Sequence, residues 1–405
     1  MLQWLVRDRG VCDNEMTNSG ILFLIESLRG GGAEKVLSTL IKYIDRERFD
    51  ITVCVISGGG IYEKEIAERV RVHRVLKSVS SYSGLSKAWY RIKYQMIYHW
   101  LPTRLVYQLF IPKGNDVEIA FVEGFATKIL SCSSNSKAKK IAWVHCDLKS
   151  QPWPIQQGIY KDNAEEADVY RRYQQVVCVS HQVEQVMRSY YGLFNTTTIY
   201  NPLDSEEIMR LSKMECPFRV DAAKFNIISV GRLERVKGFD QLISIIRNIR
   251  EKGHDVHLWI VGEGSQADAL NSLVREIEMK DYITFTGFMK NPYSLMAQMN
   301  LFVCSSRAEG FSLVLAEALL LGLPIVSMKC AGPQELIQLC GAGNLCDAYE
   351  DLEKEIQKEV GTASMSNAVQ FPFDVSVVIP QIEKLFECQK TRELIGHSNE
   401  CPSEC

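Results

Sequence analysis

Short runs of apolar, β-branched residues alternate with amphipathic segments along nearly the whole chain, and this alternation constrains its fold more than any other feature. The strand-like runs are Ile21–Ile25, Ile51–Ser57, Val117–Val122, Ile141–Val144, Val176–Ser180 and Thr197–Tyr200, then Phe225–Val230, Leu258–Val261, Ile283–Thr286, Leu301–Cys304 and Pro324–Ser327. Most carry consecutive apolar residues, which is typical of strands buried on both faces of a parallel sheet. The segments between them repeat their apolar residues with helical period. The pattern predicts an α/β fold in which helices cover parallel sheets.

A polar stretch divides this pattern into two halves. It begins with Asn201 and Pro202, a turn signal, and remains weakly periodic as far as Lys224. We therefore predict two Rossmann-like domains that face each other across a cleft. A helical pattern over Val375–Phe386, with Pro380 inside it, predicts a last helix that kinks at the proline or begins close to it. The predicted divisions are a tail at 1–19, a first domain at 20–203, a second domain at 204–374, the last helix at 375–389 and a disordered tail at 390–405.

Composition excludes several classes of protein. The 405 residues carry a net charge of −3, so the chain has no overall attraction to nucleic acid. No run approaches the roughly 18 apolar residues of a membrane span, and the N-terminus is not typical of a signal peptide. The 13 cysteines include no Cys-x-x-Cys pair, so we expect buried thiols in a reducing, cytosolic compartment. Residues 1–15, which precede Met16, are expected to be a loose tail or an artefact of the chosen start site.

Two cations follow the first strand of the second half. Arg232 and Lys237 lie in the segment from Gly231 to Gly238, where ligands of parallel sheets bind beyond the strand ends. The glycines let the backbone approach an anion closely. This segment is interpreted as a phosphate clamp, although two solvated basic residues on a loop are the simpler alternative.

A strand–loop–helix segment contains two carboxylates. After the strand that ends at Cys304, Glu309 lies in a loop and a helix is expected to begin at about Ser312, a favourable N-cap residue. The free N–H groups and partial positive charge of a helix N-terminus suit a diphosphate. Glu317 lies farther into this helix among apolar residues, so its carboxylate needs hydrogen-bond donors such as sugar or ribose hydroxyls.

The first half offers a glycine loop and a histidine. Gly30–Glu34 joins a strand to a helix and lacks the Gly-Lys-Ser/Thr ending of the phosphate-binding loop of nucleoside triphosphatases. It either brings backbone close to a ligand from the opposite domain or is a simple strand-to-helix turn. His145, which follows another strand, either donates or accepts a hydrogen bond with a substrate hydroxyl or is a packed structural residue.

The order and spacing of these motifs resemble the retaining glycosyltransferases of family 4. The matching motifs span Gly31 to about Phe386 and are Gly-Gly-Ala-Glu at 31–34, Val-Ser at 179–180, Ile-Tyr-Asn-Pro-Leu-Asp at 199–204, Gly-Arg-Leu with Lys-Gly within 231–238, Val-Gly-Glu-Gly at 261–264, the pair Glu309 and Glu317, Pro-Ile-Val at 324–326 and Gly-Pro-Gln-Glu at 332–335. The resemblance implies the GT-B fold, with a C-terminal helix that crosses back to the first domain. It is greatest to the bacterial members that assemble surface polysaccharide.

The resemblance also implies roles for individual residues at the reacting sugar. Arg232 and Lys237 would grip the donor diphosphate, and Glu309 would contact hydroxyls of the transferred sugar. His145 would lie near that sugar in the first domain. The backbone amides that would hold phosphate oxygens belong to the segment Gly310, Phe311, Ser312 and Leu313.

The remaining implied contacts concern the nucleoside and the opposite loop. Glu317 would receive the ribose hydroxyls, and Gly287 and Phe288 would border the base. Gly31 and Gly32 would lie near the pyrophosphate and the acceptor. The donor is expected to be a nucleoside-diphosphate sugar, with a UDP-sugar favoured over a GDP-sugar.

The expected chemistry needs no metal and no further cofactor. Sugar transfer builds negative charge on the leaving phosphate, which two cations and a helix N-terminus stabilise. The sequence contains no Asp-x-Asp metal motif, so protein cations are expected to replace a divalent ion. Transfer with retention, in which the departing phosphate helps to deprotonate the acceptor, needs no protein nucleophile.

The segment Lys87–Phe110 is rich in basic and aromatic residues. No Asp or Glu occurs from Arg69 through Asn115. Such a composition suits a helix on anionic lipid, which would make the acceptor a lipid-linked sugar at the inner leaflet and the protein peripheral to the membrane. The alternative is a domain helix with a solvated basic face and a buried aromatic face, and nucleic acid is poorly supported.

Two other functions compete with sugar transfer. One is a sugar-nucleotide enzyme of the same fold that does not transfer, such as a hydrolysing epimerase, which needs acid and base residues that this sequence context does not supply. The other is an inactive binding subunit of a glycosyltransferase complex. The presence of all four charged residues at 232, 237, 309 and 317 argues against it.

Overall fold

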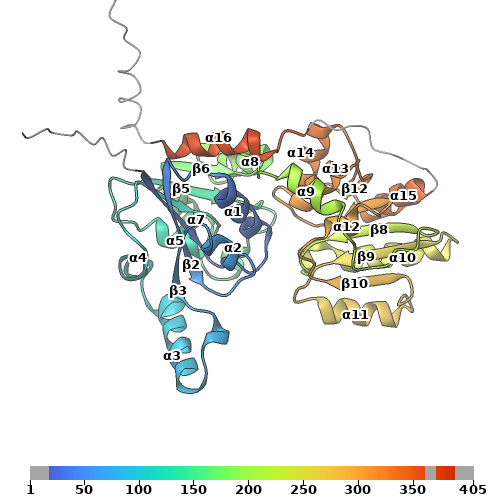
Figure 1. The fold of residues 1–405 in the computed structure, drawn as a ribbon, viewed down its shortest axis with the longest axis horizontal. Helices are drawn as coiled ribbons and strands as arrows, with labels where there is room; N and C mark the ends of the chain where they lie inside the picture. The colour runs from blue at the N-terminus through green and yellow to red at the C-terminus, as the bar shows by residue number, and fades with distance from the viewer. Residues whose placement is uncertain (1–17, 361–370, 388–405) are drawn as a thin grey trace, which may run out of the picture.

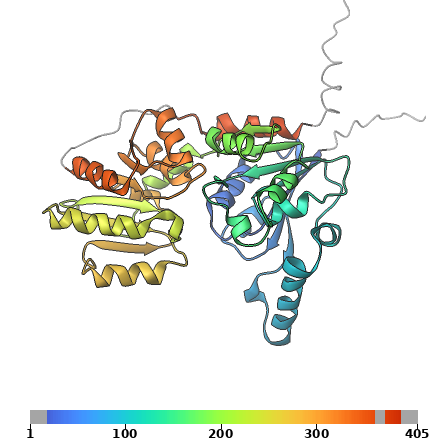
Figure 2. The ribbon, with the colours of Figure 1, turned by 180° about the vertical axis from the view of Figure 1, so that it is seen from behind.

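A computed structural model describes residues 18–360 and 371–387, and it contains two parallel sheets in two lobes (Figures 1 and 2). The first sheet has the order β3-β2-β1-β4-β5-β6-β7. Its strands are β1 (Ser19–Ile25), β2 (Phe49–Ser57), β3 (Arg71–Leu76), β4 (Val117–Ala120), β5 (Lys139–Val144), β6 (Gln175–Cys178) and β7 (Thr196–Thr198). The helices of this lobe are α1 (Gly32–Tyr43), α2 (Glu63–Ala67), α3 (Gly84–Gln95), α4 (Thr103–Phe110), α5 (Phe125–Leu130), α6 (Trp153–Gln156), α7 (Asn163–Tyr170) and α8 (His181–Ser189).

The second sheet has the order β10-β9-β8-β11-β12-β13. Its strands are β8 (Phe225–Val230), β9 (Val256–Val261), β10 (Ile283–Gly287), β11 (Leu301–Cys304), β12 (Ile325–Met328) and β13 (Asn344–Cys346). The helices around it are α9 (Ser205–Ser212), α10 (Phe239–Glu251), α11 (Ala267–Glu276), α12 (Tyr293–Met296), α13 (Leu313–Leu320), α14 (Ala331–Cys340) and α15 (Tyr349–Val360). The predicted pair of Rossmann-like domains is confirmed.

Burial explains why the apolar runs form central strands. Residues 21–25 of β1 are all at most 1% exposed, because helices cover both faces of the sheet and β2 and β4 flank the strand. The sequence pattern missed β3 and β13, which are both edge strands. In β3, Arg71, His73 and Arg74 are exposed, so the strand lacks a continuous apolar run, and β13 has only three residues.

The last helix, α16 (Val375–Phe386), crosses from the second lobe and packs on the first, as expected (Figure 1). The ring of Phe386 is fully buried and makes edge contacts with Phe23 and Phe49 at centroid distances of 5.9 and 5.6 Å. The helix begins five residues before Pro380, so the proline lies inside it rather than at its start. The predicted tails at 1–19 and 390–405 lie, apart from residues 18 and 19, outside the described residues.

The basic, aromatic segment forms a protrusion at the end of the first lobe that lies far from the second lobe (Figures 1 and 2). The segment forms α3, a π-helical turn, Met96–Trp100, and α4 rather than one continuous helix; α3 projects from the lobe, whereas α4 packs beside α5 on its body (Figure 1). The ring of Tyr98 stacks on Phe125 of α5 at a centroid distance of 4.7 Å and so connects this segment to the lobe. Among the described residues, no helix combines the length and the apolar character that a membrane crossing requires.

Candidate active site

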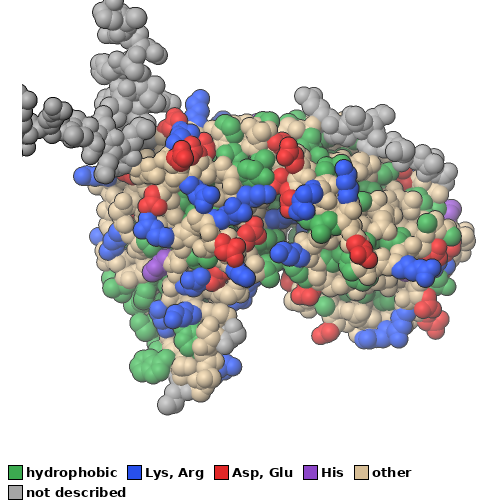
Figure 3. Space-filling model, viewed as in Figure 1, with side chains coloured by type: hydrophobic (Ala, Val, Ile, Leu, Met, Phe, Trp, Pro, Cys, Tyr) green, Lys and Arg blue, Asp and Glu red, His purple; other side chains and the backbone are tan. Residues whose placement is uncertain are grey.

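The two predicted phosphate cations, Glu309 and the glycine loop follow strands at which each sheet reverses its order. In the second sheet the reversal lies between β8 and β11, which are followed by Arg232 and Lys237 and by Glu309, respectively. In the first sheet it lies between β1 and β4, and the glycine loop follows β1. Ligands of open α/β sheets bind at such points. Figure 3 shows a hollow between the two lobes with charged side chains beside it.

Lys237 and Glu309 form an ion pair. Ser306 also donates a hydrogen bond to Glu309, with 2.8 Å between Oγ and Oε1. Burial by itself lowers the pKa of Lys237, but the Glu309 carboxylate raises this pKa above its ordinary value, so Lys237 remains a cation. Arg232 is exposed at the end of β8 and faces the first domain, where its charge opposes the rise that burial produces in the pKa of Glu34. The predicted phosphate cations and the predicted sugar carboxylate are therefore close together.

The loop before α13 differs from the expected cap. Ser312 has a left-handed backbone with φ of 58°, and its side chain makes no capping hydrogen bond. Such a conformation costs a non-glycine residue roughly 1–3 kcal/mol and is concentrated at functional sites. The Oγ atom of Ser312 is buried without a protein partner. The amides of the first turn of α13 have no partner within the helix, so hydroxyl and amides can both donate to an anion at this position.

Glu317 contacts the opposite domain. It is 1% exposed, and its Oε1 atom forms an ion pair with Lys35 of α1 and accepts a hydrogen bond from the Tyr293 hydroxyl at 3.2 Å. The other carboxylate oxygen, Oε2, is buried without a partner. Burial lowers the pKa of Lys35, but Glu317 and Tyr293 outweigh this effect and raise it. Of the two oxygens of the predicted ribose carboxylate, Oε1 is thus paired with a lysine of the first domain, and Oε2 has no hydrogen-bond partner.

His145 is held as a neutral base. Its Nε2 atom lies 3.0 Å from the carbonyl oxygen of Phe121, an acceptor, so Nε2 carries the proton and Nδ1 is left as an acceptor. Burial lowers the pKa of His145 from 6.5 to about 4. Glu123 accepts hydrogen bonds from the backbone N–H groups of His145 and Cys146, which fixes this loop. Nδ1 is therefore available to accept a hydrogen bond from a substrate hydroxyl, as the functional interpretation of His145 requires.

Loops of the two domains touch at the predicted positions. A Cβ atom at Gly310 would lie 2.1 Å from the carbonyl oxygen of His145, so only glycine allows this approach. A Cβ atom at Gly32 would lie 3.4 Å from Cδ1 of Leu313. Gly31 is the N-cap of α1, in an extended conformation. The glycine loop, the histidine loop and the start of α13 therefore meet at one inter-domain boundary.

Gly287 and Phe288 lie at the end of β10, the edge strand of the second sheet. Gly287 has a φ of +73°, and the Phe288 amide donates to Glu263 at 3.3 Å. The Phe288 side chain is 44% exposed. These two residues are separated from β8 by β9, so they lie at the side of the site rather than at its centre.

The sequence interpretation missed Lys35 and Tyr293. Lys35 directly follows the Gly-Gly-Ala-Glu motif, but its partner lies 282 residues away, so only the tertiary structure reveals the pair. Within the described residues, no group of three His, Cys, Asp or Glu side chains is arranged to hold a metal ion. The nine cysteines described are all unpaired.

Comparison with known proteins identifies the family. Residues 30–207 match the family model "Glycosyltransferase Family 4", and residues 217–361 match "Glycosyl transferases group 1". Together the two matches cover most of the chain. The chain belongs to the family 4 and group 1 glycosyltransferases. The same fold is found in the protein HepE of Anabaena, solved in complex with UDP-glucose, with a TM-score of 0.66 at 21% identity over 90% of this chain and 98% of that one.

Curated relatives of this glycosyltransferase cover it to different extents. An uncharacterized glycosyltransferase of Methanocaldococcus jannaschii is 30% identical over 55% of each chain, so the match spans about half of that relative. An uncharacterized glycosyltransferase of Haemophilus influenzae is 23% identical over 80% of this chain and 85% of its own length. The N-acetylgalactosamine-N,N'-diacetylbacillosaminyl-diphospho-undecaprenol 4-alpha-N-acetylgalactosaminyltransferase of Campylobacter jejuni is 34% identical over 32% of this chain and 33% of its own.

Proposed function

We propose that this glycosyltransferase moves a sugar, with retention, from a nucleoside-diphosphate sugar to a lipid-linked saccharide in polysaccharide or glycolipid assembly, without a divalent metal. The observation that carries the proposal is the ion pair between Lys237 and Glu309, next to a helix N-terminus whose Ser312 hydroxyl has no partner. A diphosphate supplies an anion for the Ser312 hydroxyl and for the backbone amides at the start of α13. UDP is favoured as the nucleotide, and the HepE complex with UDP-glucose supports that choice.

The residues have distinct parts in the proposed reaction. Arg232, Lys237 and the amides at the start of α13 bind the diphosphate and stabilise its growing negative charge. The bond between the sugar C1 and the phosphate oxygen breaks, and the acceptor oxygen bonds to C1 on the same face. The acceptor proton passes to the departing phosphate oxygen, so the second product is the nucleoside diphosphate. Neutral His145 accepts a hydrogen bond from a hydroxyl of the donor sugar through Nδ1, while Glu309 accepts from others.

The proposed acceptor and location depend on the protrusion. Five apolar residues of α3, the π-helical turn and α4 are between 41% and 71% exposed, namely Trp89, Ile92, Trp100, Leu105 and Leu109. The basic residues Lys87, Arg91 and Arg104 are exposed on the same elements. Interfacial aromatics with basic side chains suit an anionic membrane surface. The name of the Campylobacter relative, which includes a diphospho-undecaprenol, supports a lipid-linked acceptor. We propose that the protein works in the cytosol at the inner leaflet.

A donor screen tests the reaction. Purified protein is incubated with UDP-, GDP- and ADP-sugars, a membrane extract as the acceptor source and a metal chelator, and nucleotide release and sugar incorporation are measured. The proposal predicts incorporation by the wild type and loss of incorporation in Lys237→Met and Glu309→Gln, with the fold retained. Lys252→Met, which removes a surface ion pair with Glu353, is the matched control. Release of free sugar without incorporation would favour the epimerase alternative, and nucleotide binding without any release would favour a binding subunit.

Vesicle flotation tests the membrane surface. The double variant Trp89→Ser, Trp100→Ser is expected to lose binding to vesicles that contain anionic lipid, because both rings are exposed. Arg91→Glu with Arg104→Glu is expected to weaken it in a salt-dependent manner. Lys93 is unsuitable for this test, since its Nζ donates to the Val75 carbonyl at 2.7 Å. Binding equal to that of the wild type in both double variants would contradict the proposal.

A further inference from the structure

Glu335 joins the two domains through three hydrogen bonds. Its Oε1 accepts from the backbone N–H of His181 at 2.9 Å and from the hydroxyl of Tyr200 at 2.6 Å, and its Oε2 accepts from the N–H of Gln182 at 3.1 Å. Glu335 belongs to α14 of the second domain, and it is 7% exposed. Both carboxylate oxygens of Glu335 therefore accept hydrogen bonds from backbone amides of α8 in the first domain, and Oε1 also accepts one from Tyr200 in the segment that links the domains.

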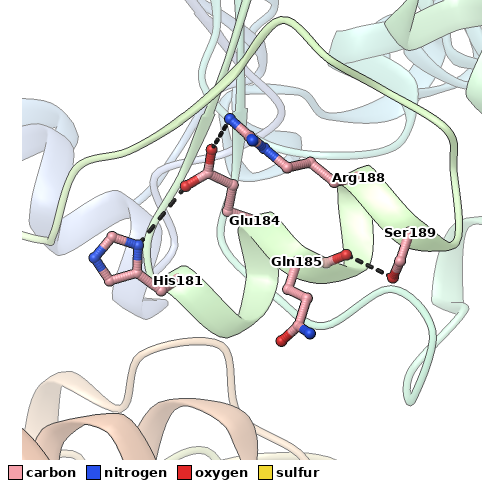
Figure 4. Close-up of a pocket in the computed structure, with 5 residues that line it drawn as sticks. All are labelled: His181, Glu184, Gln185, Arg188 and Ser189. Carbon is pink, nitrogen blue, oxygen red and sulfur yellow. Dashed lines mark hydrogen bonds and ion pairs between the residues drawn. The ribbon is translucent and has the colours of Figure 1, made fainter.

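These bonds complete the N-terminus of α8. The first amides of a helix have no partner within the helix. In α8, the Ser180 side chain accepts only from Val183, and Glu335 accepts from His181 and Gln182. The partial positive charge at this terminus favours a carboxylate. Figure 4 shows the first turn of α8, with His181 at its start, above an orange element of the second domain. A helix of one domain thus obtains its cap from the other.

The same helix, α14, contacts the loop between β11 and α13, which carries Glu309 and is called the donor loop below. The Gly332 amide donates to the carbonyl of Glu309 at 3.0 Å, and the Cys330 thiol lies 3.0 Å from the carbonyl of Ser306. A Cβ atom at Gly332 would lie 2.6 Å from the backbone of Phe311, so the contact is as close as glycine permits. The start of α14 therefore cannot move relative to this loop without breaking these contacts.

Aromatic rings reinforce the connection. Tyr200 packs against Phe311 at 6.0 Å and against Phe373 at 5.0 Å, and these two phenylalanines lie 5.3 Å apart. Phe311 belongs to the donor loop, Tyr200 to the link between the domains and Phe373 to the segment before α16. Any rotation of one domain against the other changes these contacts.

We infer that Glu335 is a positioning residue: it fixes the angle between the domains and so sets the distance between the donor loop and the first-domain groups at His145. This inference rests on the proposed function. The hydrogen bonds of Glu335 go to none of the residues proposed to bind the nucleotide, so we expect it to act on transfer and not on nucleotide binding. Its motif, Gly-Pro-Gln-Glu at 332–335, and the tyrosine at 200 have no other part in the proposed reaction.

The test compares Glu335→Gln and Tyr200→Phe with the control Glu353→Gln. The control carboxylate bonds to Asn248 and Lys252 within the second domain only. An amide cannot accept through its nitrogen, so Glu335→Gln leaves at least one α8 amide unpaired. We expect at least a tenfold fall in kcat for sugar transfer, a larger radius of gyration in X-ray scattering and a Kd for UDP within threefold of that of the wild type. Tyr200→Phe is expected to lower kcat by a smaller factor, and the control to change none of the three.

The outcomes separate this inference from the proposed function. Unchanged kcat and unchanged scattering in Glu335→Gln would overturn the inference. So would a fall in kcat that is matched by an equal fall in the folded fraction or by a loss of UDP binding, since a merely structural role predicts that result. If the wild type itself neither binds UDP nor transfers sugar, the proposed function fails, while the scattering comparison still decides whether Glu335 holds the domains.

Discussion

If Glu317 receives the two ribose hydroxyls through both of its carboxylate oxygens, nucleotide binding displaces Lys35 from Oε1. The Lys35 ammonium pairs with Oε1 of that carboxylate, and Glu317 is 1% exposed. Replacement of Lys35 by Met keeps a long apolar stem beside the Tyr293 ring and removes the charge. The variant should therefore bind the nucleotide more tightly, since no lysine has to leave Oε1 of Glu317.

The size of the effect follows from the bond that is broken. A hydrogen bond to a charged group contributes about 1.5–3 kcal/mol. The Lys35 side chain is 33% exposed, so water recovers part of this energy when the pair separates. A net cost of about 1.4 kcal/mol corresponds to about a tenfold change in Kd. The Kd of Lys35→Met for UDP should thus be about tenfold lower than that of the wild type.

Isothermal titration calorimetry with UDP measures this difference. Lys42→Met is the matched control, because Lys42 lies on the same helix and pairs with Asp204 at 2.6 Å, away from the donor loop. Equal affinity in Lys35→Met and the wild type would refute the displacement. Weaker binding would refute it as well, since Lys35 would then contribute to the bound state.

Three further outcomes follow from the structure. Burial lowers the pKa of His145 from 6.5 to about 4, so the unfolded chain binds this proton first and the stability of the fold decreases as pH falls from 6.5 to 4. The difference in unfolding free energy between the wild type and His145→Gln, measured by urea denaturation, should therefore change by roughly 3 kcal/mol over that range. A difference that stays constant with pH would contradict this pKa. Ser312→Ala removes a hydroxyl without a protein partner, so the Tm of the variant should equal or exceed that of the wild type, while its Kd for UDP rises about tenfold. An unchanged Kd would show that Ser312 does not contact the phosphate. Phe386→Ala empties a buried site under α16 and should lower the unfolding free energy by about 3–5 kcal/mol, and a loss below about 1 kcal/mol would show that the crossing helix contributes little.

The sequence predicted the fold well where burial controls residue choice. A strand with helices on both faces must be apolar throughout, so β1 and β8 were evident as runs of consecutive apolar residues. An edge strand needs no such run, which is why β3, with its exposed Arg71 and His73, was missed. The two-domain architecture follows from central strands alone, so these omissions did not affect it.

The candidate site was predicted less completely, because its details depend on contacts between distant residues. Motif spacing identified Lys237 and Glu309, and these side chains do meet. Ser312 suited an N-cap by residue type, but it has a left-handed backbone and makes no capping hydrogen bond. The position of the proton on His145 is fixed by the Phe121 carbonyl, and Glu317 pairs with Lys35; neither contact is a local property of the chain.

The central claim is that protein cations and backbone amides, rather than a divalent ion, hold the nucleotide diphosphate. Calorimetric titration of UDP in buffer that contains a metal chelator tests it directly, with Lys237→Met measured beside the wild type. The account predicts saturable binding by the wild type and its loss in the variant. Binding that requires added magnesium or manganese, or that survives unchanged in Lys237→Met, would contradict it.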